Sequence, residues 1–252
     1  MSTEQATPRA LVTGASTGIG AATVRALRTQ GWDVVATARR ADRLTALAEE
    51  TGADAFPADL TDDAEVAALV THVRAGGPLR SLVNVAGGAL GADSVERGDI
   101  EEWRTMYDRN VLATLRITQG LLDDLRADGG GDVVVVTSTA AHDTYPGGGG
   151  YVAAKHAERV IASTLRLELV GQPVRVIEIA PGMVKTEEFA LHRLHGDAEA
   201  AERVYAGVAE PLVAEDVADA IAWALTRPPH VNVDSMVLRP RAQASNTVVA
   251  RG

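Results

Sequence analysis

The chain has 252 residues, 46% of them hydrophobic, and a formal net charge of −10 at pH 7. This size and composition favour one globular domain with a large core, and the acidic balance disfavours binding to nucleic acid or to an anionic membrane surface. The chain has no cysteine, which excludes disulfides and thiolate–metal sites, and its apolar runs are shorter than the ~20 residues of a membrane helix.

Short, valine-rich apolar runs alternate with helix-like segments along the chain. The expected strands are residues 10–13, 33–38, 53–58, 81–85, 132–137, 174–179 and 236–238. The expected helices include residues 21–27, 43–50, 65–74, 101–126, 151–169 and 215–226. Such alternation is typical of a parallel sheet with helices on both faces, so we predict an α/β fold.

The two ends of the chain differ in character from the rest. The first eight residues have no basic start and no apolar stretch, so they do not resemble a secretory signal. We expect residues 1–8 to be extended or disordered, residues 9–240 to form one domain, and residues 241–252 to form a tail. Because nothing indicates export, a cytoplasmic protein is expected.

A glycine-rich turn follows the first expected strand. Its sequence is Thr13-Gly14-Ala15-Ser16-Thr17-Gly18-Ile19-Gly20. Glycine permits a tight turn and a close approach to a ligand, and the start of the next helix offers free N–H groups to a phosphate. The spacing differs from the G-x-G-x-x-G fingerprint, but it would act in the same way. Taken alone, the segment is equally compatible with an ordinary strand-to-helix loop.

Further along the chain, Tyr151, Lys155 and Ser138 supply the groups that proton transfer to an alcohol oxygen requires. Residues four apart lie on one face of a helix, so Lys155 would lie beside the Tyr151 phenol. A nearby cation lowers the pKa of a phenol, which is ordinarily about 10. Ser138 follows an expected strand, at the edge where parallel sheets bind ligands. Taken alone, the Y-x-x-x-K spacing is common on surface helices.

Together these motifs resemble the short-chain dehydrogenase/reductase family, from about residue 9 to about residue 240. The matching residues occur in the order of the family and are Gly14, Gly18, Gly20, Asp59, Leu60, Asn84, Ala86, Gly87, Asn110, Ser138, Tyr151, Lys155, Pro181 and Gly182. Several motifs in register are a stronger signal than any one of them. Val85 differs, because the family usually has a second asparagine there. We expect some loss of local polar contacts at Val85 and no loss of chemistry.

The resemblance implies a fold and a set of roles. The fold is a single-domain, Rossmann-type, doubly wound parallel sheet of about seven strands in the order 3-2-1-4-5-6-7. Tyr151 is the implied general acid/base, and Lys155 lowers its pKa and binds the nicotinamide ribose. Ser138 polarises the substrate oxygen, and Asn110 links Lys155 to solvent through a water molecule. A homotetramer or homodimer is also implied.

The end of the second expected strand predicts NADP(H) as the cofactor. An NAD enzyme usually has an acid there, whereas this chain has Ala38 followed by Arg39 and Arg40. A guanidinium binds phosphate in a fork geometry, so we predict Arg39 as the main contact and Arg40 as the second. Asp59 is expected to accept from the adenine amino group. The other implied cofactor contacts are Gly14, Ser16, Thr17, Gly18, Ile19, Gly20, Leu60, Asn84, Ala86, Gly87, Tyr151, Lys155, Pro181, Gly182 and Val184.

Residues 183–211 are expected to form a lid that sets substrate specificity. From residue 175 to residue 240 the chain is similar to NADP-dependent 3-hydroxy acid dehydrogenases of the serine and allo-threonine type, and to clavulanate-aldehyde-reductase-like enzymes. The resemblance therefore implies interconversion of a secondary alcohol, with a small 3-hydroxy acid as a candidate, and a ketone or aldehyde. Lys185 or Arg193 is a candidate cation for a substrate carboxylate.

Two other functions stay open at this point. A reductase of 3-oxoacyl thioesters would dock on an acidic carrier protein, which the acidity of this chain disfavours. A non-catalytic NADP(H)-sensing protein would be expected to have lost Tyr151 or Lys155. His142 is a candidate substrate contact, and the histidines lack the spacing of a metal site, so no catalytic metal is expected.

Overall fold

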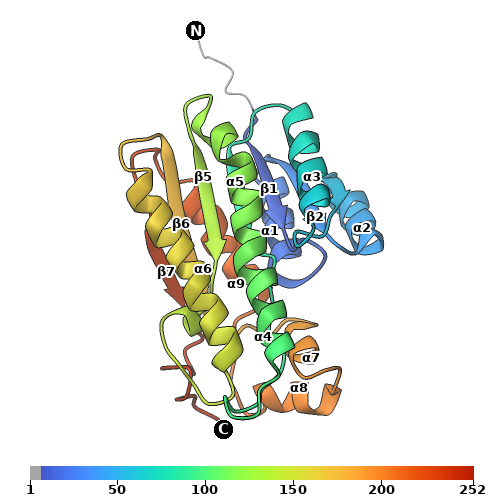
Figure 1. The fold of residues 1–252 in the computed structure, drawn as a ribbon, viewed down its shortest axis with the longest axis vertical. Coiled ribbons are helices and arrows are strands. Elements are labelled where there is room, and N and C mark those ends of the chain that lie inside the picture. The colour runs from blue at the N-terminus through green and yellow to red at the C-terminus, as the bar shows by residue number, and fades with distance from the viewer. Residues whose placement is uncertain (1–6) are drawn as a thin grey trace.

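The computed structural model describes residues 7–252 as one parallel sheet between two layers of helices (Figure 1). Most of the segment expected to be extended or disordered, residues 1–6, lies outside the described residues. The sheet has seven strands in the order β3-β2-β1-β4-β5-β6-β7, which confirms the implied topology. The strands are β1 (Arg9–Thr13), β2 (Asp33–Ala38), β3 (Asp54–Pro57), β4 (Ser81–Asn84), β5 (Gly131–Val136), β6 (Val174–Pro181) and β7 (Ser235–Leu238).

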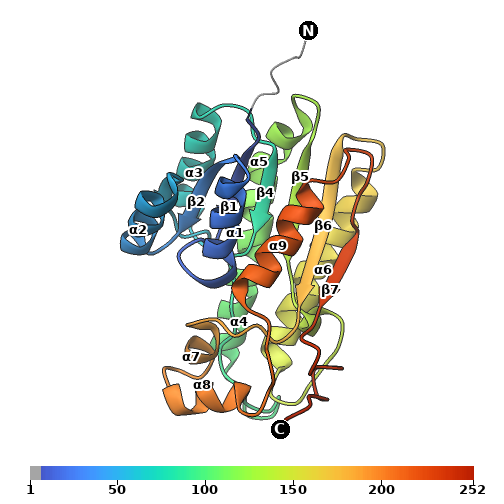
Figure 2. The same ribbon diagram turned by 180° about the vertical axis from the view of Figure 1, so that it is seen from behind.

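Helices cover both faces of this sheet, as Figures 1 and 2 show from opposite sides. The helices are α1 (Gly18–Thr29), α2 (Ala41–Thr51), α3 (Asp63–Ala75), α4 (Ile100–Tyr107), α5 (Ala113–Arg126), α6 (Gly149–Glu168), α7 (Phe189–Arg193), α8 (Ala198–Tyr205) and α9 (Ala214–Leu225). One apolar core lies between the sheet and α1, α2 and α9, and a second lies beneath α3, α5 and α6. Central strands such as β5 are therefore buried along their whole length, which explains their continuous apolar sequence.

The single helix expected over residues 101–126 is wrong, because the structure divides it. Helix α4 ends at Tyr107, a π-helical turn covers Asp108–Leu112, and α5 begins at Ala113. Asn110 lies in this turn, and its Nδ2 donates to the Met106 carbonyl at 2.7 Å. Such turns often occur at functional sites.

The expected lid, residues 183–211, contains the short helices α7 and α8, which lie beyond the lower end of the sheet in Figure 1. The C-terminal tail folds back onto the same chain. Asn246 bonds Thr139 in the loop after β5, and Arg251 donates to carbonyls of Val204 and Ala206 at the end of α8. The tail therefore connects the lid to the loop that follows β5.

Of the helices in residues 7–252, none is long and apolar enough to cross a bilayer.

A buried arginine joins the sheet to the end of α9. Arg175 Nε on β6 donates to the Asp132 carboxylate on β5 at 2.6 Å, and both side chains are almost fully buried. Its terminal nitrogens bond four carbonyls, those of Ala224, Leu225, Arg227 and Val231. The last carbonyls of a helix have no partner within the helix, so this one side chain satisfies groups that would otherwise be unpaired.

We expect the Arg175→Met variant to lose about 3–5 kcal/mol of unfolding free energy, because it leaves Asp132 buried without its main partner. Urea denaturation at neutral pH would measure the loss. The control is Arg203→Met, which removes an exposed pair with Glu199 on α8 and should cost a small fraction of that amount. Equal losses for the two variants would contradict this account.

Candidate active site

The carboxyl ends of four neighbouring strands, β1, β4, β5 and β6, meet at one edge of the sheet. Thr13 at the end of β1 joins the first two, because its Oγ1 accepts from the backbone N of Val85 and of Ala86 at 3.0 Å each. Val85 packs against the apolar core. The loop after β4 is therefore held by a threonine hydroxyl and by packing at the position where the family usually has an asparagine.

The glycine-rich turn after β1 lies directly against this loop. Gly14 has φ +64°, and a Cβ atom on it would lie 2.9 Å from backbone atoms of Ala86. Thr17 precedes α1 in an extended conformation, and its side chain makes no capping bond. The first N–H groups of α1 are thus without a side-chain cap, which suits the binding of a phosphate. The geometry of the turn is compatible with the predicted binding of a dinucleotide phosphate.

Tyr151 and Lys155, both on α6, come together with Ser138 at the same edge. Lys155 Nζ lies 5.9 Å from the centre of the Tyr151 ring, and the ring of the lid residue Phe189 packs edge-on at 5.7 Å. Ser138 begins the short helical turn after β5, where its Oγ accepts from Ala140 N at 3.1 Å and lies 3.4 Å from the Pro181 carbonyl. The structure therefore assembles the expected triad.

The electrostatics of Tyr151 differ in part from the prediction. Burial raises the pKa of Tyr151 above its ordinary value, and Lys155 and the Ser138 hydroxyl lower it only in part. Lys155 thus acts in the expected direction, but desolvation of the phenol is the larger effect. At neutral pH, Tyr151 is a phenol that can donate a proton.

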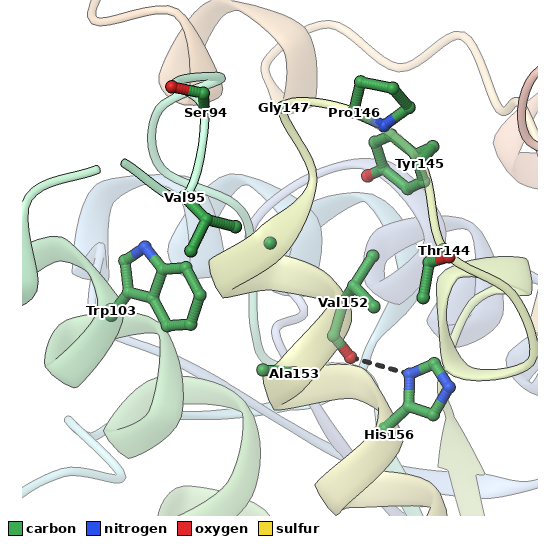
Figure 3. Close-up of a pocket in the computed structure, with 11 residues that line it drawn as sticks. Ser94, Val95, Trp103, Thr144, Tyr145, Pro146, Gly147, Val152, Ala153 and His156 are labelled. Carbon is green, nitrogen blue, oxygen red and sulfur yellow. Dashed lines mark hydrogen bonds between the residues drawn. The ribbon is translucent and has the colours of Figure 1, made fainter. Parts of the chain in front are cut away.

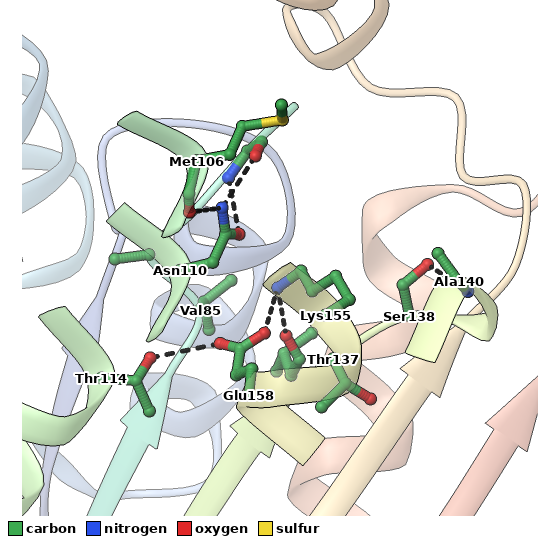
Figure 4. Close-up of polar contacts among 12 residues, drawn as sticks. Val85, Met106, Asn110, Thr114, Thr137, Ser138, Ala140, Lys155 and Glu158 are labelled. Carbon is green, nitrogen blue, oxygen red and sulfur yellow. Dashed lines mark hydrogen bonds and ion pairs between the residues drawn. The ribbon is translucent and has the colours of Figure 1, made fainter. Parts of the chain in front are cut away.

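The amine of Lys155 has two partners within the chain, as Figure 4 shows. Its Nζ donates to the Val136 carbonyl at 3.1 Å and to Glu158 Oε2 at 2.5 Å. Thr114 on α5 donates to the other oxygen of Glu158 at 3.2 Å. Neither Glu158 nor Thr114 was predicted from the sequence, because an acid three residues after a lysine usually lies on an exposed helix face.

Asn110 is fully buried and fixes the loop after β4. Its Nδ2 donates to the Gly88 carbonyl at 2.9 Å, and its Oδ1 accepts from Gly88 N at 3.1 Å. A Cβ atom on Gly87 would lie 2.4 Å from Asn110 Oδ1 and 3.6 Å from Lys155 Nζ. Asn110 and Lys155 therefore both lie close to Gly87, and a larger residue there would clash with Asn110.

The two predicted phosphate contacts differ in their surroundings. Arg40 forms a bidentate pair with the lid residue Glu188 at 2.7 and 2.8 Å, and it also donates to Ser16 Oγ at 3.0 Å. Hydrogen bonding to Arg40 lowers the pKa of Glu188. Within residues 7–252, Arg39 makes no hydrogen bond. Arg39 therefore has its full set of donors for a ligand, while Arg40 holds the lid.

Asp59 lies near Arg39, at the start of the loop after β3. Its Oδ1 accepts from Thr61 N at 3.0 Å and from Thr61 Oγ1 at 2.8 Å. Burial opposes the charge on Asp59, but the Thr61 bonds and the charges of Arg39 and Arg109 lower its pKa. Arg109 is a cation near this end of the site that sequence reasoning did not identify.

The other predicted cofactor residues lie along the same edge. Asn84 and Leu60 are buried, and Asn84 Nδ2 lies 3.4 Å from Thr118 Oγ1. Gly18 faces the lid, because a Cβ atom on it would lie 3.3 Å from Thr186. Ile19 and Val184 pack on the core, and Gly182 lies against Gln243 of the tail. The lid and the tail are thus both in contact with the predicted cofactor segment.

The candidate substrate contacts are held by other parts of the chain. His142 Nε2 lies 3.0 Å from the buried Glu178 carboxylate. Arg193 of the lid donates to Tyr145 Oη at 3.1 Å and to the Gly147 carbonyl at 3.0 Å. Lys185 is about half exposed and lies 3.6 Å from Glu202. Of the two candidate cations, Arg193 has the closer link to the loop before Tyr151.

A pocket of about 540 Å³ lies beside the start of α6, as Figure 3 shows. Its lining includes Trp103, Tyr145, Val152 and His156, and His156 Nδ1 donates to the Val152 carbonyl at 2.9 Å. Ser138, Tyr151 and Lys155 do not line it. The pocket is therefore separate from the reacting groups, and we do not assign the substrate to it.

Comparison with known proteins places these features in context. Residues 8–194 match the family described as short chain dehydrogenase. An oxidoreductase of Mycobacterium tuberculosis is 56% identical over 94% of this chain and 92% of its own length. Serine 3-dehydrogenase of Agrobacterium fabrum is 42% identical over 93% of this chain and 94% of its own length. The closed form of a serine dehydrogenase complexed with NADP+ is 33% identical, covers 97% of this chain and 99% of its own, and has a TM-score of 0.89.

We expect Tyr151 to ionise above the ordinary phenol value of about 10, because burial outweighs the nearby cation. The measurement is the ultraviolet absorbance of phenolate as pH rises, taken as the difference between the parent protein and Tyr151→Phe. The other three tyrosines are common to both proteins and cancel in the difference. A phenolate that forms below the ordinary value and disappears in Tyr151→Phe would contradict the prediction.

Proposed function

The chain belongs to the short-chain dehydrogenase family, and on that premise we propose that it is an NADP(H)-dependent oxidoreductase interconverting a secondary alcohol and a ketone, or a primary alcohol and an aldehyde. The observation that carries this proposal is the meeting of Ser138, Tyr151 and Lys155 at the edge of the sheet where the glycine-rich turn also lies. A hydroxyl, a phenol and an ammonium in that place supply a proton path to a substrate oxygen.

In the proposed reduction, Tyr151 donates its proton to the substrate oxygen, and in oxidation it takes the proton back. Ser138 holds and polarises the same oxygen, because its hydroxyl lies at the end of β5 beside the phenol. Lys155 stabilises the phenolate that forms when the proton leaves. Because burial favours the phenol at neutral pH, the site suits carbonyl reduction there, and alcohol oxidation is favoured as pH rises.

NADP(H), when bound, supplies or accepts the hydride. Its pyrophosphate would be held by the turn around Gly14 and by the start of α1, where the N–H groups have no side-chain cap. Arg39 would hold the 2′-phosphate with all of its donors, and Arg40 would assist while bound to Glu188. Asp59 would accept from the adenine. The NADP+ in the similar serine dehydrogenase supports this assignment.

We propose a small hydroxy acid as the substrate. Two of the similar proteins act on serine by name, and serine carries a carboxylate on the carbon adjacent to the one that bears its hydroxyl. A substrate carboxylate needs a cation near Tyr151, and Arg193 has the better position for that role. Three of its five N–H donors bond Gly91, Tyr145 and Gly147, so further donors are left for a ligand.

The assembly implied by the family resemblance, a homotetramer or homodimer, is also a proposal. Large apolar side chains are exposed at several places on the described residues, and two groups of them are candidate contact faces. One group, Val160 and Leu167, lies on α6, and the other, Trp223 and Val237, lies on α9 and β7. A second copy of the chain at each of these faces would remove them from water.

We expect Tyr151→Phe to lower kcat at least about a hundredfold while the protein remains folded, because the proton donor is lost and the ring is kept. The measurement is NADPH oxidation with a panel of small aldehydes, ketones and 3-oxo acids. Tyr107→Phe is the matched control, an exposed phenol at the end of α4 that should keep most of the activity. Turnover by Tyr151→Phe at the parent rate would sink the mechanism.

We expect Arg39→Asp to shift the ratio of kcat/KM for NADP+ over NAD+ toward NAD+ by about ten- to a hundredfold, since charged hydrogen bonds to the phosphate are lost. Arg241→Asp, at an exposed residue of the tail, makes the same change of charge and should leave the ratio as it is. An unchanged ratio in Arg39→Asp would refute the role of Arg39.

A further inference from the structure

Glu158 is a buried carboxylate in direct contact with the amine of the active site. It lies one helical turn after Lys155 on α6 and has no exposed surface. Its Oε2 accepts from Lys155 Nζ at 2.5 Å, and its Oε1 accepts from Thr114 Oγ1 at 3.2 Å (Figure 4). Both oxygens are therefore bonded, one by the lysine and the other by a hydroxyl from the neighbouring helix α5.

The hydrogen bonds of Lys155 fix the position of its amine and leave part of its donors free. An ammonium group has three N–H donors. Two of them are bonded, one to the Val136 carbonyl and one to Glu158, which leaves one donor for a ligand. Lys155 Nζ would lie 3.6 Å from a Cβ atom on Gly87, so the amine is close to the loop after β4. The two protein bonds thus fix the amine at the edge of the sheet.

Stability alone does not account for this pair. Replacing a buried ion pair with apolar side chains of similar size is often neutral or stabilising. Removing only the acid is a different case, because an ammonium group would then be buried without a counter-charge. The pair therefore matters more for the protonation state of Lys155 than for the packing of α6 against α5.

We propose that Glu158 is a positioning residue that keeps Lys155 an ammonium, so that the proton exchanged with substrate comes from Tyr151 and not from the lysine. This inference rests on the proposed function only for its last clause. The first clause concerns two side chains of the unliganded protein and can be tested without turnover.

The electrostatics of the buried groups support this assignment. Burial opposes the charge on Lys155, but Glu158 and Tyr151 together raise the pKa of the amine above its ordinary value. Burial also raises the pKa of Glu158, and Lys155 and Thr114 offset part of that effect. Glu178 on β6 also raises the pKa of Glu158, and Tyr145 in the loop before α6 raises the pKa of Tyr151, but neither is among the groups that shift the pKa of Lys155.

Because Glu158 touches Lys155, its main effect is on the pKa of the amine and not on that of the Tyr151 phenol. Glu158 touches the amine directly, whereas it acts on the Tyr151 phenol only at longer range, where it raises the pKa of Tyr151 as the smallest contribution. Two groups that share their titration lose the first proton from the site with the lower pKa. Because Glu158 touches the amine, it stabilises the charged form of Lys155 directly. Removing that carboxylate therefore lowers the pKa of Lys155 and moves the first loss of a proton toward the amine.

The chain contains only two lysines, Lys155 and Lys185, so lysine-selective isotope labelling would give a spectrum that can be assigned. We expect the side-chain NMR signal of Lys155 to show a charged amine up to a pH above the ordinary lysine value of about 10.4. In Glu158→Gln its midpoint should fall by about two pH units or more. Lys185→Arg assigns the signals, and Lys185 is about half exposed and serves as the internal reference.

Two further variants complete the test. Glu158→Asp keeps the charge and should restore a large part of the Lys155 midpoint. Glu178→Gln removes another buried carboxylate, one bonded to Thr137 and His142 and not to the lysine, and should leave the Lys155 midpoint within about a few tenths of a unit of the parent. A Lys155 midpoint that is the same in Glu158→Gln as in the parent overturns the inference.

If Glu158→Gln does not fold, Thr114→Val and the parent protein decide the question. Thr114→Val removes the hydrogen bond that stabilises the charged form of Glu158. The Lys155 midpoint should therefore fall in the same direction, by a smaller amount. A parent protein in which Lys155 loses its proton below the ordinary lysine value also overturns the inference. Failure of the proposed function would appear elsewhere, as unchanged turnover in Tyr151→Phe, so the two claims fail separately.

Discussion

The burial of an ammonium group beside a phenol is the constraint on which the rest of this site depends. Lys155 is almost fully buried, and a charge in that place is tolerated only with partners. Those partners are the Val136 carbonyl at the end of β5 and the Glu158 carboxylate on the same helix. The sheet edge, α6 and α5 must therefore be correctly packed before the amine can act on Tyr151. The position of the amine beside Tyr151 thus depends on how the core packs.

The lid and the tail bring distant parts of the chain to the same edge. Glu188 in the lid bonds Arg40 at the end of β2, and Phe189 packs against Tyr151. Asn246 in the tail bonds Thr139, which directly follows Ser138. The lid thus contacts both Arg40, at the predicted cofactor end of the site, and Tyr151. Closure of such a segment excludes water and strengthens every charge interaction beneath it.

Several parts of the site could be predicted because they depend on local spacing. Tyr151 and Lys155 face the same way because they lie four residues apart on one helix, and Gly14 had to be glycine because its backbone lies against Ala86. The division of α4 from α5 could not be predicted, since Asp108–Leu112 contains no proline or glycine that would mark a break in the helix. The effect of Lys155 on the pKa of Tyr151 could be predicted, but the larger effect of burial could not, because burial is a property of the folded chain.

The sequence by itself determined the alternation of strands and helices, the glycine-rich turn, and the placement of Tyr151 and Lys155 on one helix face, because periodicity and residue type act over a few neighbouring positions. The strand order came from family resemblance and not from the pattern. Only the tertiary structure decided that Glu158 is buried against Lys155 and that Glu188 reaches Arg40. An acid near a lysine or an arginine ordinarily lies in water. Whether it does depends on which helix or loop covers it, and that is fixed by contacts between residues far apart in the chain.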